Sequence, residues 1–371
     1  MKKSMLKRYR SHSLLVLAAT MLISLNSANA SDQDPVDPVQ THIEALQIPG
    51  QALRSFDISV VDQVAHIYAL SDRSNHGIDL INTKSCKYIG RISGFTGAGK
   101  GSAGPNGLVI TGNGELWAGD GNSKVKVADL KSEKIISTVF TGGKGRVDEL
   151  AYDRKDRIVI AANDEDTPPF VTFISENRGH KIKGRLKFKQ ATNGLEQPVW
   201  DSVRNLVYIA IPEINSDAKH GAIAVINPIT QKLIRLITVE ECMPAGMALG
   251  AKGNLVVGCS DDAVKAGFSP KSLIVNPRDG STLATFHQVG GSDEVWSDGN
   301  RFYLAAVSNR GGPVVGIIDA TSEKWVANIP TGPHAHSVAV DADTGKIFVP
   351  RAAGKDNKLC PTGCVSVYTT K

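Results

Sequence analysis

A unit of roughly 40–50 residues recurs along this chain, and this repetition constrains the fold more than any other feature. In each unit an apolar strand leads into a turn with Asp or Gly, and a second strand rich in β-branched and aromatic residues follows. A polar loop, a third strand ending in Asp or Asn, a short turn and a last strand complete the unit. The units start near residues 56, 105, 147, 195, 244, 292 and 335, which makes seven.

The clearest copies of the first two strands lie at 57–62 with 66–70, 147–153 with 157–160, and 336–341 with 346–349. The third strand is clearest at 77–82, 125–129, 222–227 and 315–319. Four strands per unit, repeated around an axis, are typical of a propeller. The sequence therefore predicts an all-β fold, a seven-bladed β-propeller of four-stranded antiparallel blades.

The two ends of the repeat array complement each other. The seventh unit stops after its third strand at 364–368, and residues 43–50 resemble the fourth strand of the sixth unit at 325–332. A partial ring would leave an unpaired sheet edge. We therefore expect residues 41–48 to pair with 364–368, which closes the last blade with the N-terminal strand and makes 41–371 one propeller domain.

The first thirty residues have the features of a secretory signal peptide. Five basic residues up to Arg10 precede an apolar run at 14–25, and Ala28-Asn29-Ala30 fits the small-residue cleavage pattern. We expect cleavage before Ser31, a short mature segment at 31–40, and a periplasmic or secreted protein. No later stretch predicts a membrane span.

The charge of the mature chain argues against nucleic-acid binding. Removing the five basic residues of the signal leaves 37 Lys and Arg against 37 Asp and Glu. A nucleic-acid binder keeps a basic face. The expected partners are a small polar molecule or another protein.

The five cysteines all lie in the mature part, where export makes disulfides the expectation. Cys242 enters the fifth unit and Cys259 ends its second strand, so both reach the same face. Cys360 and Cys364 flank a short Pro-Thr-Gly loop on that face, whereas Cys86 follows a third strand on the opposite face. We expect Cys242–Cys259 and Cys360–Cys364 disulfides, with Cys86 a free thiol.

The repeated units, of which Asn205-Leu206-Val207-Tyr208-Ile209-Ala210 is an example, resemble the YVTN-type repeats of YncE-like bacterial secreted propellers. They are similar, more distantly, to NHL and SMP-30/gluconolactonase repeats. The literal Tyr-Val-Thr-Asn signature is absent. The resemblance implies the propeller fold and leaves function open, because such propellers include lactonases, lyases, quinoprotein subunits and binding scaffolds. For the quinoprotein role the sequence offers no support.

One position of the repeat, at the start of the innermost strand, is rich in polar residues. The column reads Asp57, Asn106, Asp148, Glu196, Ala245, Asp293 and His336, with a register error of one allowed in units five and six. The carboxylates of Asp57, Asp148, Glu196 and Asp293 would repel one another unless a cation or hydrogen bonds offset them, so they are candidate ligands for calcium or another divalent cation. SMP-30 lactonases hold a metal in such a funnel. Two alternatives stay open, namely turn capping by these residues and direct binding of a polar organic ligand.

Further polar residues are predicted to lie near the same face and are candidates for ligand binding. Asp72-Arg73-Ser74-Asn75 and Ser308-Asn309-Arg310 combine a guanidinium with amides, which suits carboxylate or phosphate recognition. The full set is Asp72, Arg73, Asn106, Glu149, Glu294, Asn309, Arg310 and Arg351. The alternative for each is a solvated loop residue.

His334 and His336 flank Ala335 at the start of the seventh unit. On a strand, two histidines at this spacing point to one side, and they are the best candidates for a general base. A structural role is the alternative.

No other catalytic motif is present: the chain lacks Gly-x-Ser-x-Gly, His-Glu-x-x-His and a Walker loop. Trp117, Trp200, Trp296 and Trp325 fall in strand positions and are predicted to pack the blades. The sequence favours an exported binding or scaffold propeller that recognises a polar ligand or partner at its axial funnel. The alternative is a divalent-cation-dependent hydrolase or lyase of lactonase type, in which the metal polarises a carbonyl and His334 or His336 moves a proton.

Overall fold

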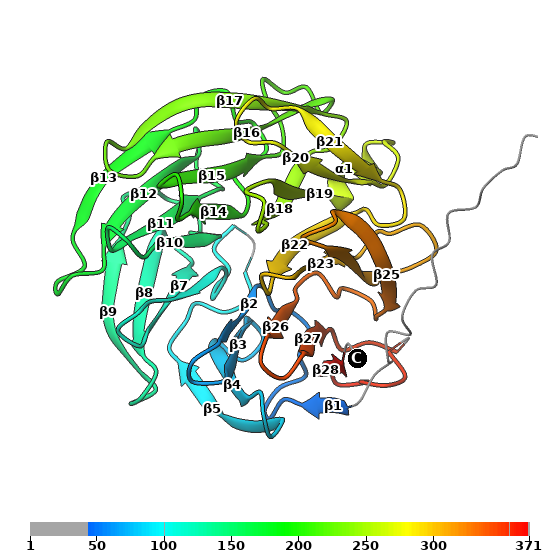
Figure 1. Ribbon diagram of the computed structural model, residues 1–371. Coiled ribbons are helices and arrows are strands. Elements are labelled where there is room, and N and C mark those ends of the chain that lie inside the picture. The colour runs from blue at the N-terminus through cyan, green and yellow to red at the C-terminus, as the bar shows by residue number, and fades with distance from the viewer. Residues whose placement is uncertain (1–43, 100, 356, 370–371) are drawn as a thin grey trace, which may run out of the picture. The chain divides into compact units, whose positions relative to one another are not determined.

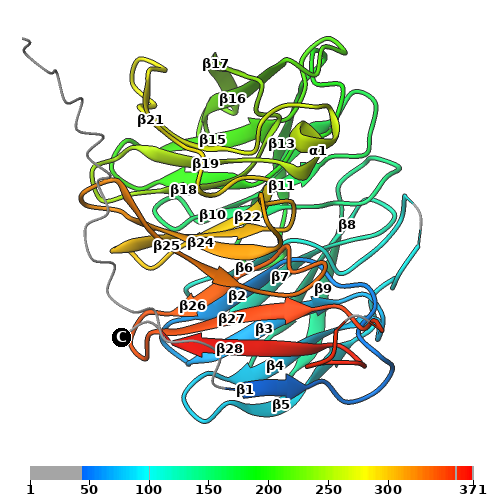
Figure 2. The same ribbon diagram turned by 90° about the vertical axis from the view of Figure 1, so that its right-hand side faces the viewer.

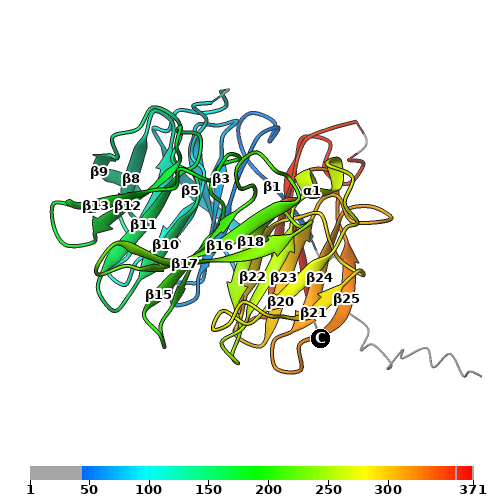
Figure 3. The same cartoon turned by 90° about the horizontal axis from the view of Figure 1, so that it is seen from above.

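The computed structural model describes residues 44–99, 101–355 and 357–369. Their contacts place all of these described residues in one compact unit. The predicted signal peptide at 1–30 and the segment at 31–40 lie outside the described residues. Seven antiparallel four-stranded sheets surround a common centre (Figure 1). Seen from above, the third sheet (β10–β13, within residues 150–187) and the sixth sheet (β22–β25, within residues 292–330) lie on opposite sides of the ring (Figure 3). The predicted seven-bladed β-propeller is confirmed.

The strands are grouped here by their distance from the centre. The innermost strands are β2 (Ser59–Asp62), β6 (Leu108–Ile110), β10 (Leu150–Asp153), β14 (Pro198–Asp201), β18 (Pro244–Leu249), β22 (Ser292–Ser297) and β26 (Ala339–Asp341). The second strands are β3 (Ile67–Asp72), β7 (Glu115–Asp120), β11 (Ile158–Asn163), β15 (Leu206–Ile211), β19 (Leu255–Cys259), β23 (Arg301–Ala306) and β27 (Lys346–Arg351).

The outer half of each blade completes the set. The third strands are β4 (Gly77–Asn82), β8 (Lys124–Asp129), β12 (Phe170–Ser175), β16 (His220–Asn227), β20 (Ser272–Val275), β24 (Val314–Asp319) and β28 (Cys364–Thr369). The outermost strands are β5 (Lys87–Ser93), β9 (Lys134–Phe140), β13 (Ile182–Lys187), β17 (Lys232–Glu240), β21 (Thr282–Phe286), β25 (Lys324–Pro330) and β1 (Glu44–Gln47). A short helix, α1 (Asp261–Lys265), lies between β19 and β20. Within the described residues, no helix is long and apolar enough to cross a membrane.

The ring is closed by strands from the two ends of the described chain. β1 pairs antiparallel with β28, from Glu44 opposite Val367 to Gln47 opposite Cys364. Figure 2 shows the blue β1 beside the red β28. Without β1 the edge of β28 would be unpaired. The predicted closure is confirmed for Glu44–Gln47, and residues 41–43 of the predicted strand lie outside the described residues.

The hydrophobic core lies between the blades. Seven clusters of buried side chains each draw on two neighbouring sheets. The cluster at the closure joins Phe56 and Tyr68 of the first blade to Phe348 and Val365 of the seventh. A second strand such as β11 is therefore buried along its whole length, whereas an outermost strand such as β13 alternates between half-buried and exposed residues.

Aspartates at the ends of the innermost strands form turns. Oδ1 of Asp62 accepts hydrogen bonds from the Val64 and Ala65 amides at 2.8 and 2.9 Å. Asp201 and Asp341 do the same at the equivalent turns. These residues lie at the opposite ends of the innermost strands from the predicted polar column.

Both predicted disulfides are confirmed. Cys242 is bonded to Cys259, with 4.4 Å between their Cα atoms, and Cys360 is bonded to Cys364. Cys86 is a free cysteine, as predicted. The pairing supports the assignment of strand ends to faces on which the polar column depends.

Candidate functional site

Five of the seven column residues carry ionisable side chains, and the structure brings these five together. Nε2 of His336 lies 3.5 Å from Oδ1 of Asp57. Asp293 is within electrostatic range of both, and Glu196 is within range of Asp148 and Asp293. We refer to Asp57, Asp148, Glu196, Asp293 and His336 as the axial funnel. Their gathering at one end of the innermost strands agrees with the sequence prediction.

The repeat explains why these positions coincide. The amides of Asp57, Asp148 and Glu196 donate to the carbonyls of Ser71, Ala162 and Ala210, at distances of 2.8, 2.8 and 2.9 Å. Each acceptor lies near the end of a second strand. In the fifth and sixth blades a bulge interrupts the pairing between the first residue of the innermost strand and its fourth. Asp293 lies in the bulge of the sixth blade and still faces the funnel.

Arg73 is engaged by protein groups. Its Nη2 donates to Asp57, and its Nε donates to Oδ1 of Asn106 at 3.0 Å. Asn106 is buried and donates in turn to the carbonyls of Ala103 and Val147, at 2.9 and 2.6 Å. Burial tends to raise the pKa of Asp57, but Arg73 and His336 outweigh it and hold the pKa at about 2. Arg73 and Asn106, predicted to bind a ligand, thus lie in a network that links the first three blades.

A second arginine, Arg146, also lies in this site, although the sequence pattern does not identify it as a candidate site residue. Its Nη2 lies 2.9 Å from Asp148 and 3.0 Å from Asp164. The signal that could have identified it is its place two residues before the column residue Asp148. Arg73 and Arg146 supply the positive charge that these acids need.

Glu196 and Asp293 differ from the other acids of the funnel. Within the described residues, neither carboxylate accepts a hydrogen bond from a protein donor. Burial, together with Asp148 and Asp293, raises the pKa of Glu196 well above its usual value. Burial also raises the pKa of Asp293 to about 6, with His336 opposing the shift. The polar groups that the protein itself leaves unpaired in the funnel are therefore acidic.

The two histidines line one cavity of about 570 Å³ beside Asp57, Arg73 and Asp293. The ring of His336 stacks on Phe56 at 4.7 Å and bonds the carbonyl of His334 through Nδ1 at 3.0 Å. Burial tends to lower the pKa of His336, but the bond to Asp57 and the charge of Asp293 raise it. His334 is exposed and has a left-handed φ of 57°. The pair lies in the turn before β26, so the expectation that both stand on one strand is wrong.

Metal binding at Asp57, Asp148, Glu196 and Asp293 stays a prediction. No group of three or more His, Cys, Asp or Glu among the described residues is arranged to hold a metal ion. The two arginines already neutralise part of the negative charge on which the metal expectation depended.

The remaining candidates lie in loops and at strand ends. Asp72 is buried, binds the amide and side chain of Asn75 at 3.0 and 2.6 Å, and contacts Arg91 at 3.3 Å. Asn309 accepts the Gly290 amide at 3.1 Å. Arg310 is exposed. Arg351 ends β27, and its guanidinium lies against Gly332 of the preceding blade. Asp72 therefore holds its own loop, and Asn309 ties its loop to the loop before β22.

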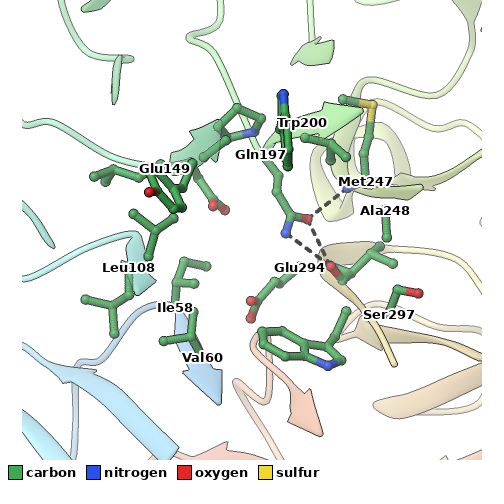
Figure 4. Close-up of a pocket in the computed structure, with 18 of the residues that line it drawn as sticks. Ile58, Val60, Leu108, Glu149, Gln197, Trp200, Met247, Ala248, Glu294 and Ser297 are labelled. Atoms are coloured by element: carbon green, nitrogen blue, oxygen red, sulfur yellow. Dashed lines mark hydrogen bonds between the residues drawn. The ribbon is translucent and has the colours of Figure 1, made fainter. Parts of the chain in front are cut away.

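Glu149 and Glu294 lie elsewhere. They line a separate cavity of about 430 Å³ that shares no lining residue with the histidine cavity (Figure 4). Its other walls are residues of the innermost strands, including Val60, Trp200 and Trp296. We call it the strand-end cavity, because its lining continues to the far ends of those strands.

Comparison with known proteins identifies the fold and nothing finer. No sequence model of a known family matches the chain, and no curated protein matches it. A chain of the Kuenenia stuttgartiensis hydrazine synthase has a TM-score of 0.68 and 12% identity, with 89% of this chain and 99% of that chain covered. A chain from a crystal structure of the mitotic checkpoint complex has a TM-score of 0.67 and 13% identity, with 97% and 99% covered. At such identities the likeness is one of β-propeller architecture.

Proposed function

We propose that this protein is an exported binding propeller whose axial funnel recognises a polar ligand that presents a cationic hydrogen-bond donor. The observation that carries the proposal is the division of the funnel acids into paired and unpaired groups. Arg73 and Arg146 satisfy Asp57 and Asp148, while Glu196 and Asp293 have no protein donor within the described residues. A guanidinium or ammonium group would supply those donors.

The same division argues against an anionic ligand. The sequence predicts that Arg73 recognises a carboxylate or phosphate, but in the structure its guanidinium is hydrogen-bonded to Asp57 and Asn106. An anion entering the funnel would approach Glu196 and Asp293 and would have to displace an existing ion pair. Such like-charge contacts oppose binding.

Export fits this proposal. Two disulfides support an oxidising compartment. The signal peptide at 1–30 and the YVTN-type resemblance support the periplasm or the exterior of a bacterium. The ligand is then a small molecule or a group on a partner protein.

Calorimetric titration with N-acetylarginine amide tests the funnel, with N-acetylnorleucine amide as the uncharged control. We expect binding of the guanidinium compound only. Glu196→Gln and Asp293→Asn should each weaken it by tenfold or more, whereas the exposed Glu240→Gln should not change it. An arginine-containing peptide that binds far more tightly than the amide would identify a protein partner. Equal binding of both amides would refute the proposal.

The cation-dependent hydrolase or lyase is the second candidate, and the pairing of His336 with Asp57 is the observation that favours it. Asp57 and Asp293 raise the pKa of His336, which favours the protonated form that a general acid requires. Metal analysis of the purified mature protein tests this alternative. The enzyme would be favoured if each chain held one calcium or magnesium ion tightly and hydrolysed lactone or ester substrates. Glu196→Gln should then lose both the metal ion and the hydrolysis.

A further inference from the structure

The strand-end cavity contains two acids that the protein does not neutralise. Glu149 is 7% exposed and Glu294 is 1% exposed. Figure 4 shows the side chains of both pointing into the space between the innermost strands. Two buried carboxyl groups in one cavity are unfavourable unless a proton or a cation accompanies them.

The side-chain carboxyl of Glu149 accepts no hydrogen bond from a donor among the described residues. The one amide side chain among the described lining residues, Gln197, is held by other groups (Figure 4). Its Oε1 accepts from the amides of Met247 and Val295 at 2.8 and 3.1 Å, and its Nε2 donates to the Val295 carbonyl at 3.1 Å. The protein thus positions Gln197 firmly and leaves the Glu149 carboxyl facing the cavity.

Glu294 is held in place on one side only. Its Oε2 accepts hydrogen bonds from the Ser337 hydroxyl and, at 3.0 Å, from the Val338 amide. Ser337 is fixed in turn by Ser59, whose hydroxyl lies 2.8 Å away. No protein donor reaches Oε1 within the part of the chain that the structure describes. The geometry therefore presents one unpaired oxygen of Glu294 and the carboxyl of Glu149 to the same space.

Most of the remaining lining is apolar or aromatic, with Ser297 and Arg154 as the polar exceptions. It includes Val60, Ile110, Met247, Trp200 and Trp296. Its one basic residue among the described residues, Arg154, is exposed at the rim. A volume of about 430 Å³ lies in the usual range for small-molecule sites.

We infer that the strand-end cavity binds an apolar organic ammonium, a molecule with one protonated amine on a hydrocarbon or aromatic body. The ammonium would donate to Glu149 and to Oε1 of Glu294, and the body would contact the apolar walls. Trp200 and Trp296 add aromatic faces, which attract cations. A neutral apolar ligand would leave Glu149 unpaired, and an anion would be repelled. This site differs from the axial funnel in its residues and in the hydrophobic body that it demands.

Proton release accompanies the binding. Burial raises the pKa of Glu149 well above its usual value and that of Glu294 to about 8. The charged groups that act most strongly on Glu149 are Glu294, Asp148, Glu196 and Asp57, and those that act most strongly on Glu294 include His336 and Asp293. The acids among them also favour the protonated carboxyls. An ammonium that pairs with either carboxylate expels its proton, so affinity should rise between pH 6 and pH 8 while the amine stays charged.

Calorimetric titration of the full mature protein with hexylammonium, hexanol and hexanoate tests the site. We expect hexylammonium to bind at least tenfold more tightly than hexanol and hexanoate not to bind. Heats measured at pH 7 in two buffers of different ionisation enthalpy should show release of about one proton per ligand. Lengthening the amine from butyl to hexyl should tighten binding by roughly three- to fourfold per methylene.

Two variants test whether Glu149 and Glu294 are the groups that bind the ammonium. Glu149→Gln should reduce the affinity for hexylammonium tenfold or more and abolish its preference over hexanol, with the Glu240→Gln variant unchanged. Glu294→Gln provides an independent check should Glu149→Gln unfold. Three results would overturn the inference. Hexanol could bind as tightly as hexylammonium, the preference for hexylammonium over hexanol could survive both substitutions, or no probe could bind. N-acetylarginine amide should still bind when hexylammonium is saturating, which separates failure of this site from failure of the funnel.

Discussion

The carboxyl of Glu294 makes the stability of the propeller depend on pH in a way that one substitution removes. Burial raises its pKa from 4.5 to about 8, against the hydrogen bonds from Ser337 and Val338. Because the folded state holds the proton more tightly than the unfolded state, the unfolding free energy decreases as pH rises through this interval. Each pKa unit corresponds to about 1.4 kcal/mol, so the loss by pH 8 is on the order of 5 kcal/mol.

The variant Glu294→Gln keeps an acceptor for Ser337 and Val338 but has no proton to lose. We expect it to match the wild-type protein near pH 4.5 and to become progressively more stable than it up to pH 8. Urea unfolding followed by circular dichroism at pH 5, 6, 7 and 8 measures the difference, with disulfides intact and Glu240→Gln as the control. Parallel curves for the wild type and Glu294→Gln over this range would refute the reasoning, because they would mean that the carboxyl ionises in the folded protein as easily as in water.

Three further predictions concern the scaffold and the funnel. Leu46→Ala should lower the unfolding free energy by about 2–4 kcal/mol, because Leu46 anchors β1 in the core of the closing blade; unchanged urea unfolding would contradict the closure. Replacing Cys242 and Cys259 by Ser should cost about 3 kcal/mol, since the bond spans 17 residues; thermal melts of oxidised protein test this. Arg146→Met should lower the unfolding free energy by about 3 kcal/mol, and adding Asp148→Asn should restore part of the loss. If urea unfolding of the double variant shows no such recovery, the ion pair is excluded.

The fold, its closure and the disulfides could be predicted because they depend on the repeat. Residues at the same place in successive units occupy equivalent places in the blades, so Asp57, Asp148, Glu196 and Asp293 meet at one end of the innermost strands.

The partners of these residues could not be predicted, because they depart from the repeat. Arg73 reaches Asn106 across a blade boundary, and Arg146 stands before its column residue in one blade only. Glu149 and Glu294 follow column residues by a single position, but that step turns their side chains to the strand-end cavity. The turn before β26, where His334 takes a left-handed conformation, likewise has no equivalent signal in the strand pattern.

The most direct test of the binding proposal is a crystal structure of the mature protein soaked with a guanidinium salt. The unpaired carboxylates predict a guanidinium ion in the axial funnel, hydrogen-bonded to Glu196 and Asp293, with Arg73 still on Asp57 and Arg146 still on Asp148. A funnel without guanidinium at saturating concentration, or a metal ion shared by the four carboxylates, would contradict the account.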